Sequence, residues 1–163
     1  MDSLDLYDTA QIKPPSKPNV AVVSEDKIFG IHREHYSYVN ISYVLCHLEE
    51  HQQHALIEHI RHKQSQALLC IVDYTLNGMP PGEIDELFTS QQEIRWKDRL
   101  GPDEWYRTRT KFTRDAIVRL VVSAGYHPST IHCGSLDGAR YRGYVIAENP
   151  EDQTTKFTSF PGT

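Results

Sequence analysis

Two groups of acidic residues stand where this chain could hold a cation or a reactive carboxylate. Glu25 and Asp26 follow the apolar run 19–23 after Ser24, and Asp73 follows the apolar run 67–72. Buried carboxylates are costly unless something compensates them, so the first pair should face solvent or a hard cation. If the second run is a strand of a parallel sheet, Asp73 lies at its carboxyl end, where ligands and reactive groups sit. The alternative is that Asp73 only starts the turn that follows.

Histidine is concentrated in one segment of the chain, and imidazole binds transition metals and titrates near neutral pH. On one continuous helix, residues three and four apart are neighbours. One face would then carry His51, His54, Glu58 and His62. We therefore consider His51, His54 and His62 as ligands of Zn²⁺, Cu²⁺ or Ni²⁺. The alternative, which such a short motif favours, is a solvated polar face without metal.

The segment 95–114 combines arginine with large aromatic side chains, a composition typical of protein interfaces and also suited to nucleic acid. Interspersed acidic residues dilute its positive charge, so a protein is the favoured partner and nucleic acid is not. The alternative is an amphipathic helix pair packed on the sheet. The residues that we expect to contact a partner are Arg95, Trp96, Arg99, Trp105, Tyr106, Arg107 and Arg109.

No familiar enzyme motif joins these residues. The sequence has no Gly-x-x-x-x-Gly-Lys phosphate loop, no Gly-x-Ser-x-Gly turn and no His-Glu-x-x-His zinc motif. A nucleophile, a base and an orienting group cannot be paired from the sequence alone. We therefore expect a protein without catalysis and without a resident cofactor.

Size and composition set the class of protein. The 163 residues suit about one domain with a proper core, and 39% hydrophobic with 24% charged residues is typical of soluble globular proteins. A net charge of −5 argues against nucleic acid or an acidic membrane as partner. No apolar run approaches the roughly 18 residues that span a bilayer, and the acidic N-terminus is unlike a secretory signal. Three cysteines without Cys-x-x-Cys spacing favour a reducing, cytoplasmic compartment.

Apolar runs alternate with helix-like stretches along the chain. Strands are expected at 19–23, 41–48, 67–72, 117–122 and 143–147, and helices at 27–38, 50–63, 83–100 and from Pro102 onward. The run 41–48 could instead begin a helix that continues to His62, and 117–122 could end the preceding helix. Residues 127–137 are expected to be irregular or helical. The alternation predicts an α/β fold with a central, mostly parallel sheet and right-handed crossovers.

We expect the chain to consist of three segments. Proline is dense near Lys13–Pro18, which predicts an extended or disordered arm over 1–18. Residues 19–150 are expected to form a single α/β domain, and 151–163 a polar tail.

In this order, four stretches resemble the receiver domains of two-component response regulators, which have a three-layer, flavodoxin-like fold. VAVVSED resembles the first strand with its acidic pair, and CIVDYTLNGMPPGEIDEL the third strand with the phosphoacceptor loop. LVVSAG resembles the fourth strand with its Ser/Thr-Ala pair, and LDGARYRGYVIAENP the approach to the fifth. The resemblance implies that Glu25, Asp26 and Asp73 bind Mg²⁺. It also implies that Asp73 accepts phosphate and that Ser123 is the hydroxyl that senses it.

The chain departs from the receiver pattern in two places. The fifth strand should end in a Lys before Pro, but the sequence there reads Ala147-Glu148-Asn149-Pro150. Asp73 and Ser123 are 123 − 73 = 50 positions apart, which indicates an extra helical insertion before the fourth strand. The resemblance therefore implies a non-catalytic signalling or regulatory module, a pseudo-receiver that acts by binding another protein.

Two alternatives to the pseudo-receiver stay open. One is a working receiver that takes phosphate on Asp73 with Mg²⁺. The other is a nucleic-acid-binding regulator that uses 95–114, in which 112–147 would form a helix and hairpin of winged-helix type; the acidic total charge counts against it.

Overall fold

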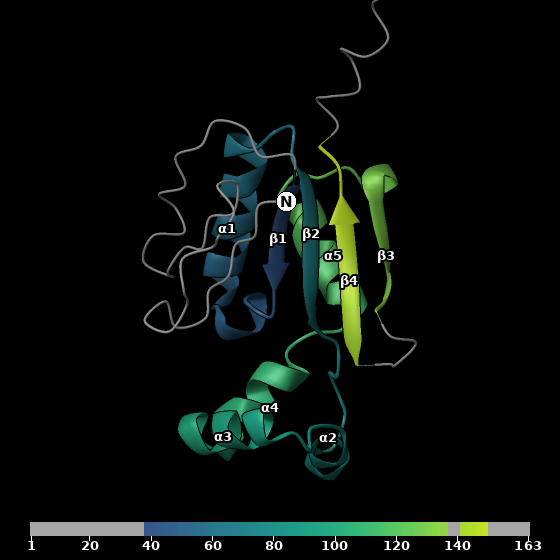
Figure 1. The fold of residues 1–163 in the computed structure, drawn as a ribbon. Coiled ribbons are helices and arrows are strands. Elements are labelled where there is room, and N and C mark those ends of the chain that lie inside the picture. The colour runs from purple at the N-terminus through teal and green to yellow at the C-terminus, as the bar shows by residue number, and fades with distance from the viewer. Residues whose placement is uncertain (1–37, 137–140, 150–163) are drawn as a thin grey trace, which may run out of the picture.

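The computed structural model describes residues 38–136 and 141–149, which form a mixed four-stranded sheet with a helical lobe at one end (Figure 1). The strands are β1 (Tyr38–Ser42), β2 (Leu68–Tyr74), β3 (Ile131–Ser135) and β4 (Arg142–Ala147), in the spatial order β1-β2-β4-β3. The helices are α1 (Glu50–Lys63), α2 (Pro81–Leu87), α3 (Gln91–Leu100), α4 (Pro102–Thr110) and α5 (Arg114–Ser123). Two 3-10 turns, η2 (Leu45–His47) and η3 (Pro128–Thr130), complete the elements of this part of the chain.

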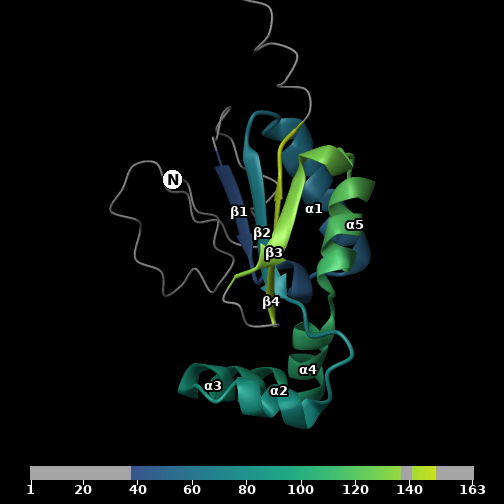
Figure 2. The same ribbon diagram turned by 90° about the vertical axis from the view of Figure 1, so that its right-hand side faces the viewer.

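Strand direction sets the topology. β1 and β2 are parallel, whereas β4 runs antiparallel to both of its neighbours, β2 and β3. β3 is therefore parallel to β2, and the reversed strand β4 fills the position between them. The connections through α1 and through α5 advance in the same direction across the sheet, and Figure 2 shows both helices on one face. The carboxyl ends of β1 and β2 point toward the helical lobe of α2, α3 and α4.

The helix-covered face of the sheet is the apolar core. β1 and β2 contribute Val39, Ile41, Leu69 and Ile71 to it, and α1 and α5 contribute Leu56, Ile57, Ile60, Ile117 and Val121. Burial alternates along β1 and β4 but is continuous along β2 after its first residue, as expected for a central strand.

Local sequence signals fix the helix boundaries. α1 begins with a capping box, in which Gln52 accepts a hydrogen bond from the Glu49 N–H at 2.9 Å. Ser90 and Thr113 cap α3 and α5 by accepting from backbone N–H groups three residues later. Gly101, at φ +83°, separates α3 from α4 in a conformation that residues with a Cβ rarely adopt.

The general α/β class is confirmed, as are the helix at 50–63 and the strands at 67–72 and 143–147. A helix also begins at Pro102, as expected. The predicted helix 83–100 is instead two helices, because α2 ends at Leu87 and a new helix, α3, begins after its N-cap residue Ser90. The run 41–48 is strand only to Ser42, after which it turns into η2.

The predicted mostly parallel, flavodoxin-like sheet is wrong, because β4 is antiparallel to both neighbours. The predicted strand 117–122 is also wrong and forms α5. In this stretch the buried residues Ile117 and Val121 are four positions apart, and Arg119 between them is exposed. This spacing is that of a helix with one apolar face. The stretch 127–137, expected to be irregular or helical, contains β3.

Several expectations fall outside the described residues. These are the strand 19–23 with Glu25 and Asp26, nearly all of the helix 27–38, the arm 1–18 and the tail 151–163. In residues 38–136 and 141–149, no helix has the length and apolar character needed to cross a bilayer.

Candidate functional site

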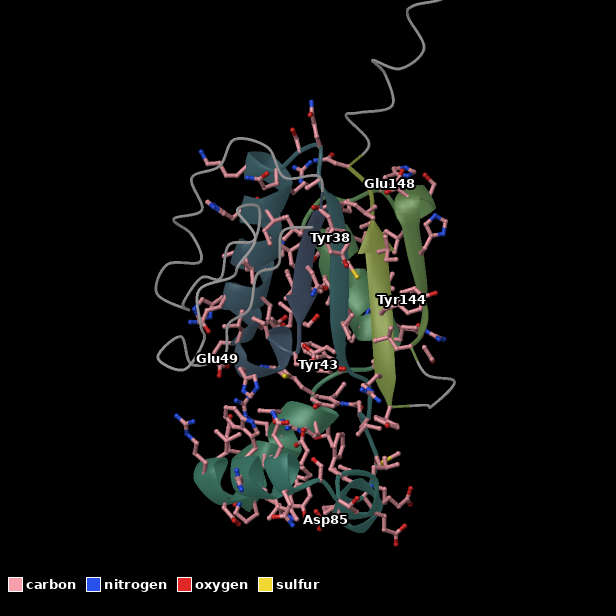
Figure 3. The ribbon with its side chains drawn as sticks, in the orientation of Figure 1. Tyr38, Tyr43, Glu49, Asp85, Tyr144 and Glu148 are labelled. Carbon is pink, nitrogen blue, oxygen red and sulfur yellow. The ribbon has the colours of Figure 1, made fainter. Side chains whose placement is uncertain are left out.

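Buried polar and titratable side chains gather where β1 and β2 end beside the helical lobe. Figure 3 shows Tyr43 at this end of the sheet and Tyr38 toward the other end of β1. Three elements meet here: the turn after β1 that contains η2, the end of β2, and α4. Because the carboxyl ends of parallel strands are the usual place for ligands in α/β folds, this is the candidate site.

Asp73, near the end of β2, is fully buried. Its carboxylate accepts hydrogen bonds from the N–H of Tyr74 at 2.8 Å and from the N–H of Cys46 at 3.1 Å. Burial raises the pKa of Asp73 to about 6, although these hydrogen bonds and the charge of Arg109 act in the opposite direction. A carboxyl group without solvent access is placed to hold the Cys46 turn rather than to meet a substrate.

Two further side chains hold the same turn by its carbonyl groups. Gln53, buried in α1, donates to the carbonyl oxygens of Leu45 at 3.0 Å and Leu48 at 2.8 Å. The Lys111 ammonium donates to the Leu48 carbonyl and lies 3.5 Å from the carbonyl oxygen of Cys46. Burial lowers the pKa of Lys111. Asp73, Gln53 and Lys111 thus all hold the turn after β1. Their hydrogen bonds fix the position of the side chains that this turn carries.

Tyr43 begins this turn with a strained backbone at φ +57°. A bulky side chain with positive φ is an outlier that costs about 1–2 kcal/mol, and such strain concentrates at functional sites. Its N–H donates to the Val72 carbonyl at 2.8 Å, and its ring lies 4.8 Å from that of Tyr74. Arg142 forms a side-chain hydrogen bond with it.

Cys46 and His47 are the titratable side chains of η2, and they differ in exposure. Cys46 is fully buried, and burial together with the charge of Asp73 raises the pKa of its thiol. His47 is only partly buried. Burial and the charge of Arg109 lower the pKa of His47 below its ordinary 6.5, although Glu104 acts in the opposite direction. His47 is therefore neutral at pH 7 and able to accept a proton.

A buried polar network joins the helical lobe to the end of β2. Glu93 of α3 accepts hydrogen bonds from Arg109 at 2.6 Å and from the side chains of Trp105 and Tyr74 at 3.2 Å each. The Arg109 guanidinium also lies over the Tyr74 ring at 4.6 Å and the Trp105 ring at 5.0 Å. The lobe is thereby held beside the candidate site.

The seven residues expected to contact a partner do not form one surface. Trp105 and Arg109 are buried in the network just described. Arg95, Arg99 and Arg107 are exposed, and Trp96 and Tyr106 are partly buried. Binding of a protein partner through the exposed members stays a prediction.

The other predicted site residues lie away from Asp73. Ser123 ends α5, the helix that begins beside the lobe and runs away from it (Figure 2), and its hydroxyl donates to the Leu120 carbonyl at 2.8 Å. On α1, His54 and His62 lie 3.8 and 3.9 Å from the exposed Glu58 carboxylate. His51 is exposed on the same helix. Within the described ranges, no three His, Cys, Asp or Glu side chains group to hold a metal ion.

No protein-family model matches the sequence, and no curated protein matches it. The fold, however, is one found in methyltransferases. Human N-acetylserotonin methyltransferase in complex with SAM aligns with a TM-score of 0.53 at 12% identity, over 91% of this chain and 39% of that one. The S-adenosylmethionine-dependent methyltransferase SibL aligns at 0.52 and 11% identity, over 82% and 36%. PigF with SAH aligns at 0.51 and 12% identity, over 80% and 35%.

This chain therefore spans a little over a third of the length of these methyltransferase-fold structures. The likeness corrects the receiver resemblance, which is wrong. It also overturns what depended on that resemblance: a non-catalytic signalling module, a phosphoacceptor at Asp73, and the expectation of no cofactor or only Mg²⁺. Nucleic acid as a partner of the segment 95–114 did not depend on the resemblance and is not tested by the fold. Acids and turns follow buried strands in many α/β folds, so short strand-end motifs do not separate one such fold from another.

His47, Tyr43 and Lys111 were not predicted as site residues. The first two lie in the run 41–48, which was expected to be a strand, although the capping box of Glu49 and Gln52 marks where α1 begins and so leaves 45–48 as a turn. Lys111 carries no sequence signal for its role, because it reaches Leu48 from a distant part of the chain.

Proposed function

We propose that this chain forms part of an S-adenosylmethionine-dependent methyltransferase that acts on a hydroxyl group. The observation that carries the proposal is the reversed strand β4 between the parallel strands β2 and β3, in a sheet whose fold is shared with methyltransferases. The hydroxyl acceptor is inferred from His47, since a hydroxyl is a weak nucleophile that needs a base, and a neutral imidazole is one.

The topology indicates where the cofactor would bind. In α/β sheets, ligands bind at the carboxyl ends of strands where the order of strands reverses direction. Both crossovers of this sheet advance the same way with helices on one face, so the reversal does not lie between β1 and β2. We expect the cofactor at the carboxyl end of β1, where the turn with the strained Tyr43 and with His47 begins.

Three side chains at this end of β1 fit S-adenosylmethionine. The partly exposed ring of Tyr43 suits a sulfonium cation, since aromatic faces attract positive charge. Asn40 and Ser42, which hydrogen-bond each other at 2.8 Å, offer polar groups to the rest of the molecule. When bound, the cofactor supplies an electrophilic methyl group attached to a positively charged sulfur.

His47 would act as the general base. It would take the proton of the acceptor hydroxyl as that oxygen forms its bond to the methyl carbon. The bound cofactor would supply the methyl group and keep the bonding electrons on its sulfur, and the hydroxyl proton would end on the imidazole of His47. Asp73, Gln53 and Lys111 act as positioning residues, because they hold the turn that carries His47.

Calorimetric titration with S-adenosylhomocysteine and transfer of labelled methyl groups to hydroxyl compounds test this function. His47→Asn should lower the transfer rate by about 10²–10⁴-fold while leaving S-adenosylhomocysteine affinity unchanged. The control is His127→Asn, in the exposed start of η3, which should change neither quantity. The wild-type rate should rise with pH through a pKa below 6.5, as His47 loses its proton.

Two results would count against the proposal in different ways. If the purified protein neither binds S-adenosylhomocysteine nor transfers methyl groups, the methyltransferase function is refuted. Binding with full activity in His47→Asn would keep the function and remove His47 as its base.

A further inference from the structure

Three side chains hold the turn that carries His47, and they differ in their access to solvent. Asp73 and Gln53 are buried, with exposed fractions of 0% and 4%. Lys111, which follows α4, is partly exposed. A ligand that lies beside His47 is therefore able to contact Lys111 but neither Asp73 nor Gln53.

The ammonium group of Lys111 lies next to the backbone on both sides of His47. It donates to the carbonyl oxygen of Leu48 and lies 3.5 Å from the carbonyl oxygen of Cys46, and these two residues flank His47 in the chain. An ammonium group has three N–H donors, so one donor remains after these two contacts. The remaining N–H is available to an oxygen atom of a ligand beside His47.

The charge of Lys111 lacks the kind of partner that neighbouring cations have. Arg107 and Arg109, which precede it in α4, each have a carboxylate oxygen at 2.6 Å. Within residues 38–136 and 141–149, Lys111 has no carboxylate at ion-pair distance. Burial lowers the pKa of Lys111, while the charges of Glu49 and Asp73 act in the opposite direction from farther away. A partly buried cation of this kind is stabilised by a ligand that carries negative charge.

Methyl transfer to a hydroxyl group produces such a charge. As His47 takes the hydroxyl proton, negative charge develops on the acceptor oxygen. A donor that is already in place where this charge develops stabilises the transition state more than the ground state. The free N–H of Lys111 is such a donor.

We propose that Lys111 is a catalytic residue, which donates a hydrogen bond to the acceptor oxygen and stabilises its negative charge. This role is additional to holding the turn. The inference rests on the proposed function and deepens it, because it assigns the group that carries the charge of the reacting oxygen.

The test uses 4-nitrophenol, an acidic hydroxyl compound whose neutral form and phenolate absorb light at different wavelengths. Spectra are recorded across pH for the free compound and for its complexes with wild type, Lys111→Met and Lys111→Arg. Gln53→Met is the matched control for the turn, because it also removes a hydrogen bond to the Leu48 carbonyl but takes away no charge. Lys63→Met, at an exposed lysine in the last turn of α1, removes a charge elsewhere. Circular dichroism checks that each variant is folded.

Wild type should bind the phenolate at least about tenfold more tightly than the neutral phenol, which lowers the pKa of the bound hydroxyl. Lys111→Met should remove most of this preference. Lys111→Arg should keep part of it, since arginine restores the charge in a different shape. Gln53→Met is expected to weaken the binding of both forms equally, so the preference between them stays, as it does in Lys63→Met.

Three results would overturn the inference. The first is equal binding of the two forms by wild type, or no binding of either. The second is a preference for the phenolate that survives in Lys111→Met. The third is a loss of the preference in Gln53→Met as complete as in Lys111→Met, because Lys111 would then act only by holding the turn.

Failure of the proposed function gives a different pattern. A preference for the phenolate that depends on Lys111, without binding of S-adenosylhomocysteine or methyl transfer, would keep the oxyanion site and refute the methyltransferase. Methyl transfer that depends on His47, without a preference for the phenolate, would keep the function and leave Lys111 as a positioning residue.

Discussion

The helix-covered face of the sheet and its carboxyl end are held together by different forces. On the helix-covered face, aliphatic side chains of β1, β2, α1 and α5 pack into one apolar core. At the carboxyl end, the lobe is attached by an ion pair and hydrogen bonds centred on Glu93 and Arg109, with aromatic rings around them. Packing is non-directional, whereas hydrogen bonds and ion pairs fix geometry.

The two regions differ in how well they tolerate substitution. The apolar face tolerates hydrophobic changes that keep its volume. A buried polar network does not, because removing one member leaves another unpaired in a poorly solvated place. The side chains that the proposed chemistry needs lie beside the network and not on the apolar face.

The largest expected effect comes from breaking the network at Arg109. Arg109→Ala should lower the free energy of unfolding by about 3–5 kcal/mol, because it leaves the Glu93 carboxylate, only 18% exposed, without its cation. Combining Arg109→Met with Glu93→Gln removes both charges and should recover most of the loss. Urea unfolding measures each variant.

Two comparison variants sharpen the contrast. Arg107→Ala breaks an ion pair with Glu104 whose side chains are both 41% exposed, and should cost less than about 1 kcal/mol. Leu56→Ala, on the apolar face, should cost about 2–5 kcal/mol through lost packing. If Arg109→Ala is as mild as Arg107→Ala, the lobe is not held by the network.

A smaller effect, visible only through pH, is expected at Asp73. Its pKa of about 6 exceeds the roughly 3.9 of an exposed aspartate, so the folded state holds this proton to a higher pH than the unfolded state. The contribution to stability is complete below about pH 4 and is lost as pH rises through 6, by about 2–3 kcal/mol. The difference in unfolding free energy between wild type and Asp73→Asn should fall by this amount from pH 4 to 7.5. Parallel pH profiles would contradict the buried-carboxyl account.

The sequence predicted those parts of the fold whose signals are local. β2 and α1 were predictable because a continuous apolar run and a helical period leave a mark over a few residues. The direction of β4 was not, because a strand that pairs with β2 and β3 looks the same in either orientation. The unknown direction of β4, together with the mistaken strand at 117–122, allowed a parallel, receiver-like fold to be expected.

The candidate site divides in the same way. Asp73 was predicted because it ends a buried strand, but its task of holding the Cys46 turn depends on a contact with a distant residue. Arg109 was predicted at a surface and is buried, because Glu93 and three aromatic rings enclose it. The sequence shows which charged residues are present, but it does not show which of them pair with one another in the folded protein.

The smallest expected effect comes from the backbone conformation of the lobe, at two glycines where an added side chain would contact nothing. Gly101 and Gly82 both have open space where a Cβ would lie, so alanine at either position meets no neighbour. Gly101 has φ +83°, and alanine there should cost about 1 kcal/mol. Gly82 lies within α2 without positive φ, and alanine should stabilise the protein by about 0.4–1 kcal/mol through a less flexible unfolded chain. Thermal unfolding should therefore shift in opposite directions for the two variants, and a shift of the same sign would mean that the conformation at Gly101 does not limit the lobe.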